Sequence, residues 1–152
     1  MGLFSQGKII MNFEELCPVL MHTHGIEAQE RPYGFVIPFK GVASLLEGLN
    51  LVRAVFRPQS ETIGHYHLVS EEAYYIESGG ARMTLWHFER TSEVYTFDVI
   101  PGDYVSVPRK YAHRIVVTSE DDFICLVASA PPFSPSDQYF INPDHGGTET
   151  KE

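Results

Sequence analysis

The sequence predicts an all-β protein, an antiparallel sandwich or barrel formed by a single domain. Eight short β-rich runs follow one another from Leu51 onwards with no long helical pattern between them. Turn signals such as Gly79-Gly80 and Pro101-Gly102 separate the runs. The ten Phe and eight Tyr also favour strands. A chain of 152 residues is long enough for one proper core and too short for two ordinary domains.

Residues 1–40 are expected to form an irregular N-terminal arm that packs on the barrel. Asn12 could cap a short helix, because the apolar residues after it fall near helical spacing until Pro18 interrupts the pattern. Later in this arm, Tyr33–Phe39 alternates in the manner of a strand and could extend one sheet. Residues 41–132 are then expected to form the barrel itself.

The barrel strands are predicted from short runs of β-branched and aromatic residues bounded by turns. In chain order these runs are Leu51–Phe56, Ile63–Leu68, Ala73–Ser78, Ala81–Phe88, Val94–Ile100, Tyr104–Val107, His113–Thr118 and Phe123–Ala130. Residues 133–152 are expected to form a C-terminal arm and tail, in which Phe133–Ile141 lies on the barrel and the tip beyond it is disordered.

Composition excludes several classes of function. A formal charge of -9, from 20 acidic and 11 basic residues, argues against binding DNA or RNA. No apolar run approaches the ~20 residues of a membrane span, and the N-terminus lacks the apolar core of a signal peptide. Cys17 and Cys125 are isolated, which provides neither a disulfide framework nor a thiolate metal site. We therefore expect a cytoplasmic protein, with Cys125 as a small buried hydrophobe.

His65 and His67 are the strongest functional signal. Side chains two residues apart on a strand point to the same face, so both imidazoles can converge on one metal ion. Glu72 could add a carboxylate from the next strand, and His113 a third imidazole from a later one. Three imidazoles and a carboxylate suit Fe, Mn, Ni, Co or Zn better than Mg or Ca.

Strand alternation supports this choice of ligands. If Glu72 faces inward, then Tyr74 and Ile76 do so as well, whereas choosing Glu71 would turn Glu77 towards the interior at a cost in desolvation. An inward His113 likewise leaves Arg114 in solvent. The alternative is that these are ordinary core or surface histidines.

Two linked motifs around these residues resemble those of the cupin superfamily. The first cupin motif, G-x5-H-x-H-x3,4-E-x6-G, corresponds here to Gln59 through His65, His67 and Glu72 to Gly79. The second, G-x5-P-x-G-x2-H-x3-N, corresponds to Gly102, Pro108, Lys110, His113 and Val117. The resemblance covers about residues 51–130 and implies a six- to eight-stranded jelly-roll barrel (a double-stranded β-helix). It places His65, His67, Glu72 and His113 around one metal.

The chain departs from the cupin motifs at three positions, where Gln59 and Lys110 replace Gly and Val117 replaces Asn. None is a ligand position, so these changes cast more doubt on the geometry of the turns than on metal binding. Lys110 could contact an anionic substrate or could simply be solvated.

Other residues give weaker signals. His22 and His24 form a second His-x-His near Glu27, for which an exposed loop is favoured over a second site. His87 is expected to be structural and His145 solvated.

Arg53 and Tyr74 are candidate catalytic residues, because an inward arginine could pair with a substrate carboxylate or phosphate and an inward tyrosine could donate a proton. An outward Arg53 and a purely packing Tyr74 are the alternatives. Ile76 and Met83 would line the same cavity.

The predicted function is a metal-dependent small-molecule enzyme, with oxygenase or oxidase chemistry slightly preferred because such a centre leaves exchangeable metal positions. A Lewis-acid isomerase, cyclase or decarboxylase acting on a carbonyl or sugar-phosphate substrate is one alternative. A non-catalytic cupin that holds a ligand through the metal is another.

We also expect a homodimer, from an outer apolar face that includes Tyr66, Leu68 and Tyr75. The Arg31-Pro-Tyr-Gly34 segment resembles a short element that precedes sugar-phosphate isomerase cupins.

Overall fold

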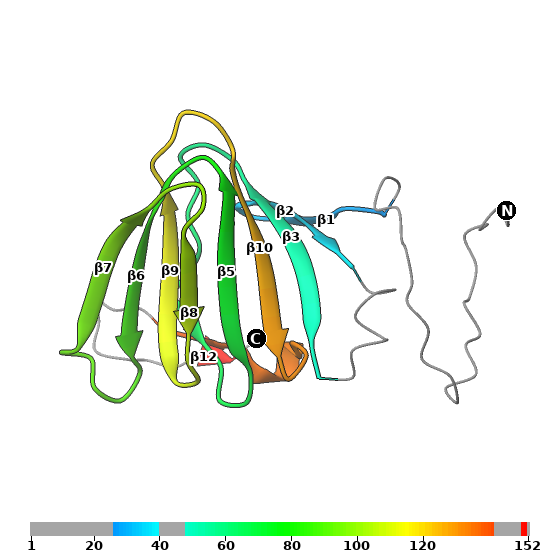
Figure 1. Cartoon of the computed structure of the whole chain (residues 1–152). Helices are drawn as coiled ribbons and strands as arrows, with labels where there is room; N and C mark the ends of the chain where they lie inside the picture. The colour runs from blue at the N-terminus through cyan, green and yellow to red at the C-terminus, as the bar shows by residue number, and fades with distance from the viewer. Residues whose placement is uncertain (1–25, 40–47, 142–149, 152) are drawn as a thin grey trace, which may run out of the picture.

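Two six-stranded antiparallel sheets face each other in this protein (Figure 1). The structure, a computed structural model, describes residues 26–39, 48–141 and 150–151. The first sheet has the order β1 (Gln29–Arg31), β2 (Gly34–Pro38), β3 (Asn50–Phe56), β10 (Phe123–Ala130), β5 (Glu71–Ser78) and β8 (Tyr104–Val107). The second has the order β12 (Thr150–Lys151), β11 (Tyr139–Phe140), β4 (His65–Tyr66), β9 (Tyr111–Val117), β6 (Ala81–His87) and β7 (Val94–Val99). The predicted all-β antiparallel fold is confirmed.

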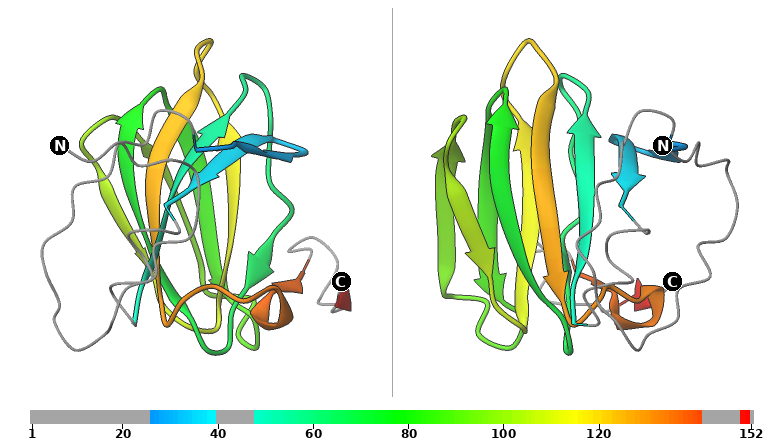
Figure 2. Two further views of the ribbon diagram at one scale, coloured as in Figure 1. Left: turned by 90° about the vertical axis from the view of Figure 1, so that its right-hand side faces the viewer. Right: turned by 45° about the vertical axis from the view of Figure 1, so that its right-hand side comes forward.

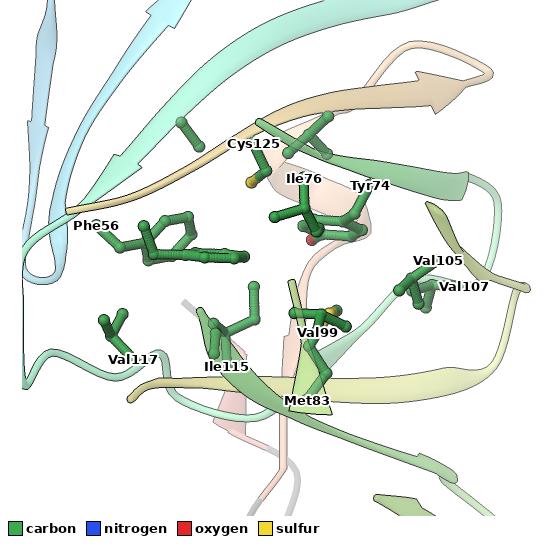
Figure 3. Packing of buried hydrophobic residues seen from close by; sticks show 14 of the residues in the cluster. Phe56, Tyr74, Ile76, Met83, Val99, Val105, Val107, Ile115, Val117 and Cys125 are labelled. Carbon is green, nitrogen blue, oxygen red and sulfur yellow. The ribbon is translucent and has the colours of Figure 1, made fainter. Parts of the chain in front are cut away.

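The main core lies between the two sheets and follows from strand alternation. On β6, Ala81 and Met83 are buried between the sheets, while Arg82 between them is exposed. Figure 3 shows Tyr74 and Ile76 of one sheet directed towards Met83 and Ile115 of the other. Because each side chain of this core is apolar or aromatic, burial from water is the main force that holds the sheets together.

A second, smaller core lies on the outer side of the second sheet. It consists of Tyr66, Trp86, Ala112 and Ile141, with Phe88 and Tyr139 packed against it. Tyr66 stacks on the Tyr139 ring at 5.2 Å and on the Phe88 ring at 4.4 Å. This cluster attaches the chain that follows β10 to the sheet.

That chain, residues 131–141, is called the C-terminal arm below. It leaves β10, forms one 3-10 turn at Pro135–Asp137, and pairs as β11 with β4. Figure 2 shows the arm at the end of the sheets where β10 finishes. The backbone N–H of Ile141 donates to the Gly64 carbonyl over 2.9 Å. A Cβ at Gly64 would lie 2.6 Å from the Ile141 carbonyl oxygen, so glycine permits this close approach.

Three details differ from the sequence-based expectations. The strand expected at Ile63–Leu68 contains only His65–Tyr66, because the chain after it turns into a loop that hydrogen-bonds to the arm. Gln29–Arg31 pairs as an additional edge strand, which its polar residues did not suggest. Tyr66 was expected on an exposed apolar face but is only 1% exposed, because the arm covers it.

At the two positions where another residue replaces a motif glycine, the backbone keeps a conformation that favours glycine. Gln59 has φ 61° and Lys110 has φ 69°, both in the left-handed region. Lys110 also donates its backbone N–H to the His67 carbonyl over 2.8 Å. The turns therefore persist despite the substitutions.

Several expectations lie outside the described residues: the short helix after Asn12, the second His-x-His at His22 and His24, Cys17 and His145. Cys125 is described, and it is a free, fully buried thiol as expected. Burial raises its pKa. Within the described part of the chain, no helix is long and apolar enough to cross a lipid bilayer.

Candidate metal centre

His65, His67, Glu72 and His113 lie together at one end of the space between the sheets. One potential ligand atom from each of the four side chains lies within 4.8 Å of the others. Strand register brings them there, because His65 of β4 pairs directly with His113 of β9. Glu72 comes from β5 on the facing sheet, and His67 follows β4 in the loop that leads to β5. The four residues expected from the sequence therefore form a group that could bind a metal ion.

Each of the three imidazoles is oriented by a backbone carbonyl. Nδ1 lies 2.9 Å from the Ile63 oxygen in His65, 2.8 Å from the Asp137 oxygen in His67, and 3.4 Å from the Tyr111 oxygen in His113. A carbonyl oxygen only accepts hydrogen bonds, so each Nδ1 carries the hydrogen and donates it. In the neutral ring, Nε2 then presents its lone pair, which is the arrangement typical of metal-binding histidines.

Glu72 lies among these Nε2 atoms and is almost fully buried. Its Oε2 is 3.1 Å from Nε2 of His113, and its Oε1 is 3.5 Å from Nε2 of His67. The Tyr74 hydroxyl donates to Oε2 over 2.9 Å, and the Ser129 hydroxyl donates to Oε1 over 3.2 Å. These two donors hold both oxygens of the carboxylate beside the imidazoles.

The Nε2 atom of His67 tests whether the group suits a metal. It is buried and has no hydrogen-bond partner among the described residues, and the 3.5 Å to Glu72 is too long for a good hydrogen bond. A buried nitrogen without a partner is costly unless something else binds it. A first-row transition metal accepts imidazole nitrogen and carboxylate oxygen, so the residues present fit such an ion.

Electrostatics shift the pKa values of His65 and His67 in opposite directions. Burial, followed by the neighbouring His113, lowers the pKa of His65 to about 3. For His67, burial opposes the charged form, but the Glu72 carboxylate and the Asp137 carbonyl outweigh it and raise the pKa. Burial would also raise the pKa of Glu72, yet His113 and His67 hold it well below its ordinary range. Glu72 is therefore ionised at neutral pH.

Tyr74 lies inside this group and Arg53 lies outside it. The Tyr74 hydroxyl contacts Glu72 and is 3.1 Å from Nε2 of His113, while burial and the Glu72 charge raise its pKa well above the ordinary value. Arg53 instead pairs with Glu77 at 2.8 Å on the outer face of the first sheet, with 38% of its side chain exposed. The structure thus does not bring Arg53 to the candidate metal centre.

The remaining expected positions have simpler roles. Ile76 and Met83 are fully buried in the core between the sheets. His87 is buried on β6, where its Nδ1 accepts the backbone N–H of Glu89 over 3.2 Å. Lys110 is half-exposed, with its Nζ 4.0 Å from Glu89.

Two residues that contact the ligands were missed from the sequence. Ser129 shares the inward face of β10 with Phe123, Cys125 and Val127, so strand alternation could have found it. Asp137 gives no comparable signal. Its contacts are with a loop almost seventy residues earlier in the chain, and local sequence does not specify that pairing.

Comparison with known proteins identifies the family. Residues 55–148 match the family model described as glucose-6-phosphate isomerase (GPI), which spans all four candidate ligands. The chain is also 33% identical, over 99 residues, to the uncharacterized protein MJ1618 of Methanocaldococcus jannaschii. That alignment covers 65% of this chain and 70% of the relative.

Solved structures support the fold. The capsular polysaccharide assembling protein CapF of Staphylococcus aureus superposes with a TM-score of 0.64 at 18% identity, covering 75% of this chain and 33% of that one. Oxalate decarboxylase of Bacillus subtilis superposes with a TM-score of 0.65 at 21% identity, covering 74% and 29%. This chain spans about a third of the length of these proteins. The motifs, the two facing sheets and the matched model together show that the chain is a cupin and belongs to the glucose-6-phosphate isomerase family.

Proposed function

We propose that this protein is a metal-dependent isomerase that interconverts the aldose and ketose forms of a phosphorylated sugar. The family match over residues 55–148 carries the choice of reaction, because it includes every candidate ligand. Glucose 6-phosphate and fructose 6-phosphate are the first pair to test. The ionised Glu72 among three oriented imidazoles supports a metal centre for this reaction.

Conversion of the aldose to the ketose moves one hydrogen from C2 to C1 and one hydroxyl hydrogen from O2 to O1, which shifts the carbonyl from C1 to C2. A metal held by His65, His67, His113 and Glu72 would supply Lewis-acid polarisation of the sugar oxygens. The residues of the chain supply the orientation. The backbone carbonyls direct Nε2 of each histidine inward, while Tyr74 and Ser129 hold the two oxygens of the Glu72 carboxylate.

Tyr74 serves in this proposal as a hydrogen-bond donor next to the reacting centre. It keeps its proton at neutral pH because burial and the neighbouring carboxylate disfavour the phenolate. Its ring is part of the main core, which limits the positions its hydroxyl can reach. A fixed donor of this kind costs little reorganisation during the reaction.

The oxygenase or oxidase chemistry preferred from the ligand set alone becomes the second candidate. Its support is the donor set, which also accommodates Fe or Mn. Dioxygen consumption in the presence of a substrate would favour it. Stoichiometric metal binding without turnover would favour the non-catalytic, ligand-holding alternative.

The test uses the 152-residue chain loaded in turn with Mn, Fe, Co, Ni and Zn. Each form is incubated with fructose 6-phosphate in D2O, and carbon-13 and proton NMR follow product formation and exchange at C1 and C2. We expect conversion and exchange with at least one metal. His67→Ala should lose both, since it removes a ligand, whereas His87→Ala changes a buried histidine of β6 and should retain them.

If every metal-loaded form bound its ion but gave neither conversion nor exchange with aldose and ketose phosphates of three to six carbons, the isomerase proposal would be wrong. Equal metal loss in His67→Ala and His87→Ala would show that the centre is misassigned.

A further inference from the structure

We propose that Asp137 of the C-terminal arm is a positioning residue for the metal centre. We infer that it orders the loop joining His67 to Glu72 and orients the His67 ring. The inference rests on the metal centre of the proposed function, but not on the reaction assigned to it. Asp137 lies in the turn Pro135–Asp137, about seventy residues beyond the loop that it contacts.

The side chain of Asp137 binds three consecutive backbone N–H groups. Leu68 donates to Oδ1 over 2.9 Å, Val69 donates to both oxygens at 3.1 Å, and Ser70 donates to Oδ2 over 2.9 Å. Successive N–H groups that converge in this way form an anion-binding concavity. Hydrogen bonds to a charged acceptor are about twice as strong as those between neutral groups.

The main chain of Asp137 contacts the metal centre directly. Its carbonyl oxygen lies 2.8 Å from Nδ1 of His67, which fixes the direction in which Nε2 points. A single residue of the arm therefore holds a ligand through its backbone and holds the loop after that ligand through its side chain. If the side chain released the loop, the carbonyl would also lose its fixed distance from His67.

The loop has little other support on this side. Residues 68–71 are the only link between the ligands His67 and Glu72. Within it, the Ser70 hydroxyl donates to the Pro131 carbonyl over 2.9 Å, which is again a contact with the arm. Leu68 and Val69 are exposed at 40% and 55%, so apolar packing does not order them. The Asp137 carboxylate is consequently the main side-chain restraint on residues 68–70. The ligands at the two ends have backbone support of their own, because the Lys110 N–H binds the His67 carbonyl and Glu72 is paired within the first sheet.

The burial of Asp137 makes the arrangement specific. The residue is only 7% exposed, and a buried carboxylate is costly unless hydrogen bonds compensate for it. The loop N–H groups supply that compensation. The same N–H groups could be satisfied by water in an exposed loop, which would leave the distance between His67 and Glu72 less well defined.

The test compares Asp137→Ala with Ser119→Ala in the otherwise unchanged chain. The Ser119 hydroxyl also accepts a backbone N–H, that of Gly80 over 3.0 Å, but in the turn between β9 and β10 at the opposite end of the sheets (Figure 1). Metal-free protein is titrated with Co(II), which reports affinity and, through its visible absorption bands, coordination geometry. Unfolding midpoints of the metal-free variants are measured in parallel.

We expect Asp137→Ala to bind Co(II) about 10- to 100-fold more weakly with shifted absorption bands, as removal of such supporting contacts typically does. Ser119→Ala should keep the affinity and the bands of the original protein. If Asp137→Ala does not fold, Asp137→Asn preserves the size and one acceptor oxygen, and the same weakening and band shift are expected. A folded Asp137 variant with unchanged affinity and bands would overturn the proposal.

Because the readout is metal binding, the two proposals can fail separately. Loss of Co(II) affinity in Asp137→Ala together with an inactive original protein would support the positioning role and reject the isomerase. Absence of Co(II) binding by the original protein itself would overturn both.

Discussion

Tyr74 donates its hydroxyl hydrogen to Oε2 of Glu72 over 2.9 Å, two residues along the same face of β5. The pair arises directly from strand alternation, which turns residues 72, 74 and 76 towards the same space. The aromatic ring belongs to the core, while the hydroxyl extends to the candidate metal centre. The stability of the core and the orientation of a ligand are thereby linked in one side chain.

Removing only this hydroxyl should weaken the centre without disrupting the core. We expect Tyr74→Phe to bind Mn(II) about 10-fold more weakly, because Glu72 loses the donor that orients it. The lost hydrogen bond should also lower the free energy of unfolding of the metal-free protein by about 1 kcal/mol. Manganese titration followed by electron paramagnetic resonance measures the affinity. Tyr75→Phe is the matched control, since Tyr75 is 48% exposed on the outer face, and equal affinities in both variants would contradict the prediction.

The stability of the metal-free protein should depend on His65 between pH 6.5 and 5. Below pH 6.5 the unfolded chain protonates this imidazole, whereas the folded protein does not do so until about pH 3. The unfolded state then binds more protons, so stability falls as the pH falls. The raised pKa of His67 affects stability above this range of pH. Its contribution to the stability of the folded protein is fully present below pH 6.5 and is lost as the pH rises through the folded-state pKa. The lowered pKa of Glu72 contributes above about pH 4.5 and is lost below it.

The measurement is urea unfolding at several pH values in that range. The slope of unfolding free energy against pH should be shallower in His65→Gln by up to about 1.4 kcal/mol per pH unit, the limit for one proton. His87→Gln serves as the comparison. Identical slopes in the original protein and His65→Gln would show that His65 is protonated alike in both states.

Much of the candidate centre could be predicted from the sequence because three of its four residues lie on strands. Side-chain direction on a strand has a period of two, so the inward positions of His65, Glu72 and His113 follow from local sequence. The runs at Tyr104–Val107 and Phe123–Ala130 were likewise predicted with the observed bounds, since turn residues delimit both. Strand alternation and turn residues were sufficient to predict these strands, because each extends between clear turns.

The contribution of the C-terminal arm could not be predicted in the same way. Tyr66 alternates outward from the core, so the sequence indicated exposure, yet β11 and Ile141 cover it. Asp137 contacts a loop far away in sequence through backbone donors that any residue type could offer. The turn Pro135–Asp137 has no periodic pattern. Such tertiary contacts depend on the path of the arm, which alternation does not specify.

Of the apolar face from which a homodimer is expected, the arm covers Tyr66, whereas Leu68 and Tyr75 are exposed. Tyr75 and Tyr104 are paired neighbours on the outer face of the first sheet and are 48% and 66% exposed. We expect light scattering to give twice the chain mass of 17.2 kDa at micromolar concentration, and a smaller mass for Tyr75→Ser combined with Tyr104→Ser. Val94→Ser replaces an exposed residue of β7 as a control. A mass of 17.2 kDa for the unmodified protein would rule out the dimer.

Gly64 should control how closely the C-terminal arm approaches the second sheet. An added Cβ would lie 2.6 Å from the Ile141 carbonyl oxygen and 2.7 Å from Cη2 of Trp86, both closer than real carbon contacts. Backbone and a fully buried indole cannot both yield easily, so Gly64→Ala should displace the arm and destabilise the protein by about 1–3 kcal/mol. Trp86 is the only tryptophan of the chain and reports this region through its fluorescence.

We expect a red-shifted emission and a lower urea midpoint in Gly64→Ala, together with weaker Co(II) binding, because the displaced arm also carries Asp137. Gly80→Ala is the matched control, since a Cβ there would meet its nearest atoms at an ordinary 3.6 Å. If Gly64→Ala lost stability but kept the original cobalt affinity and absorption bands, β11 and the turn containing Asp137 would be independent. A loss of both would show that the attachment of β11 beside His65 and the placement of Asp137 beside His67 are parts of one cooperative contact.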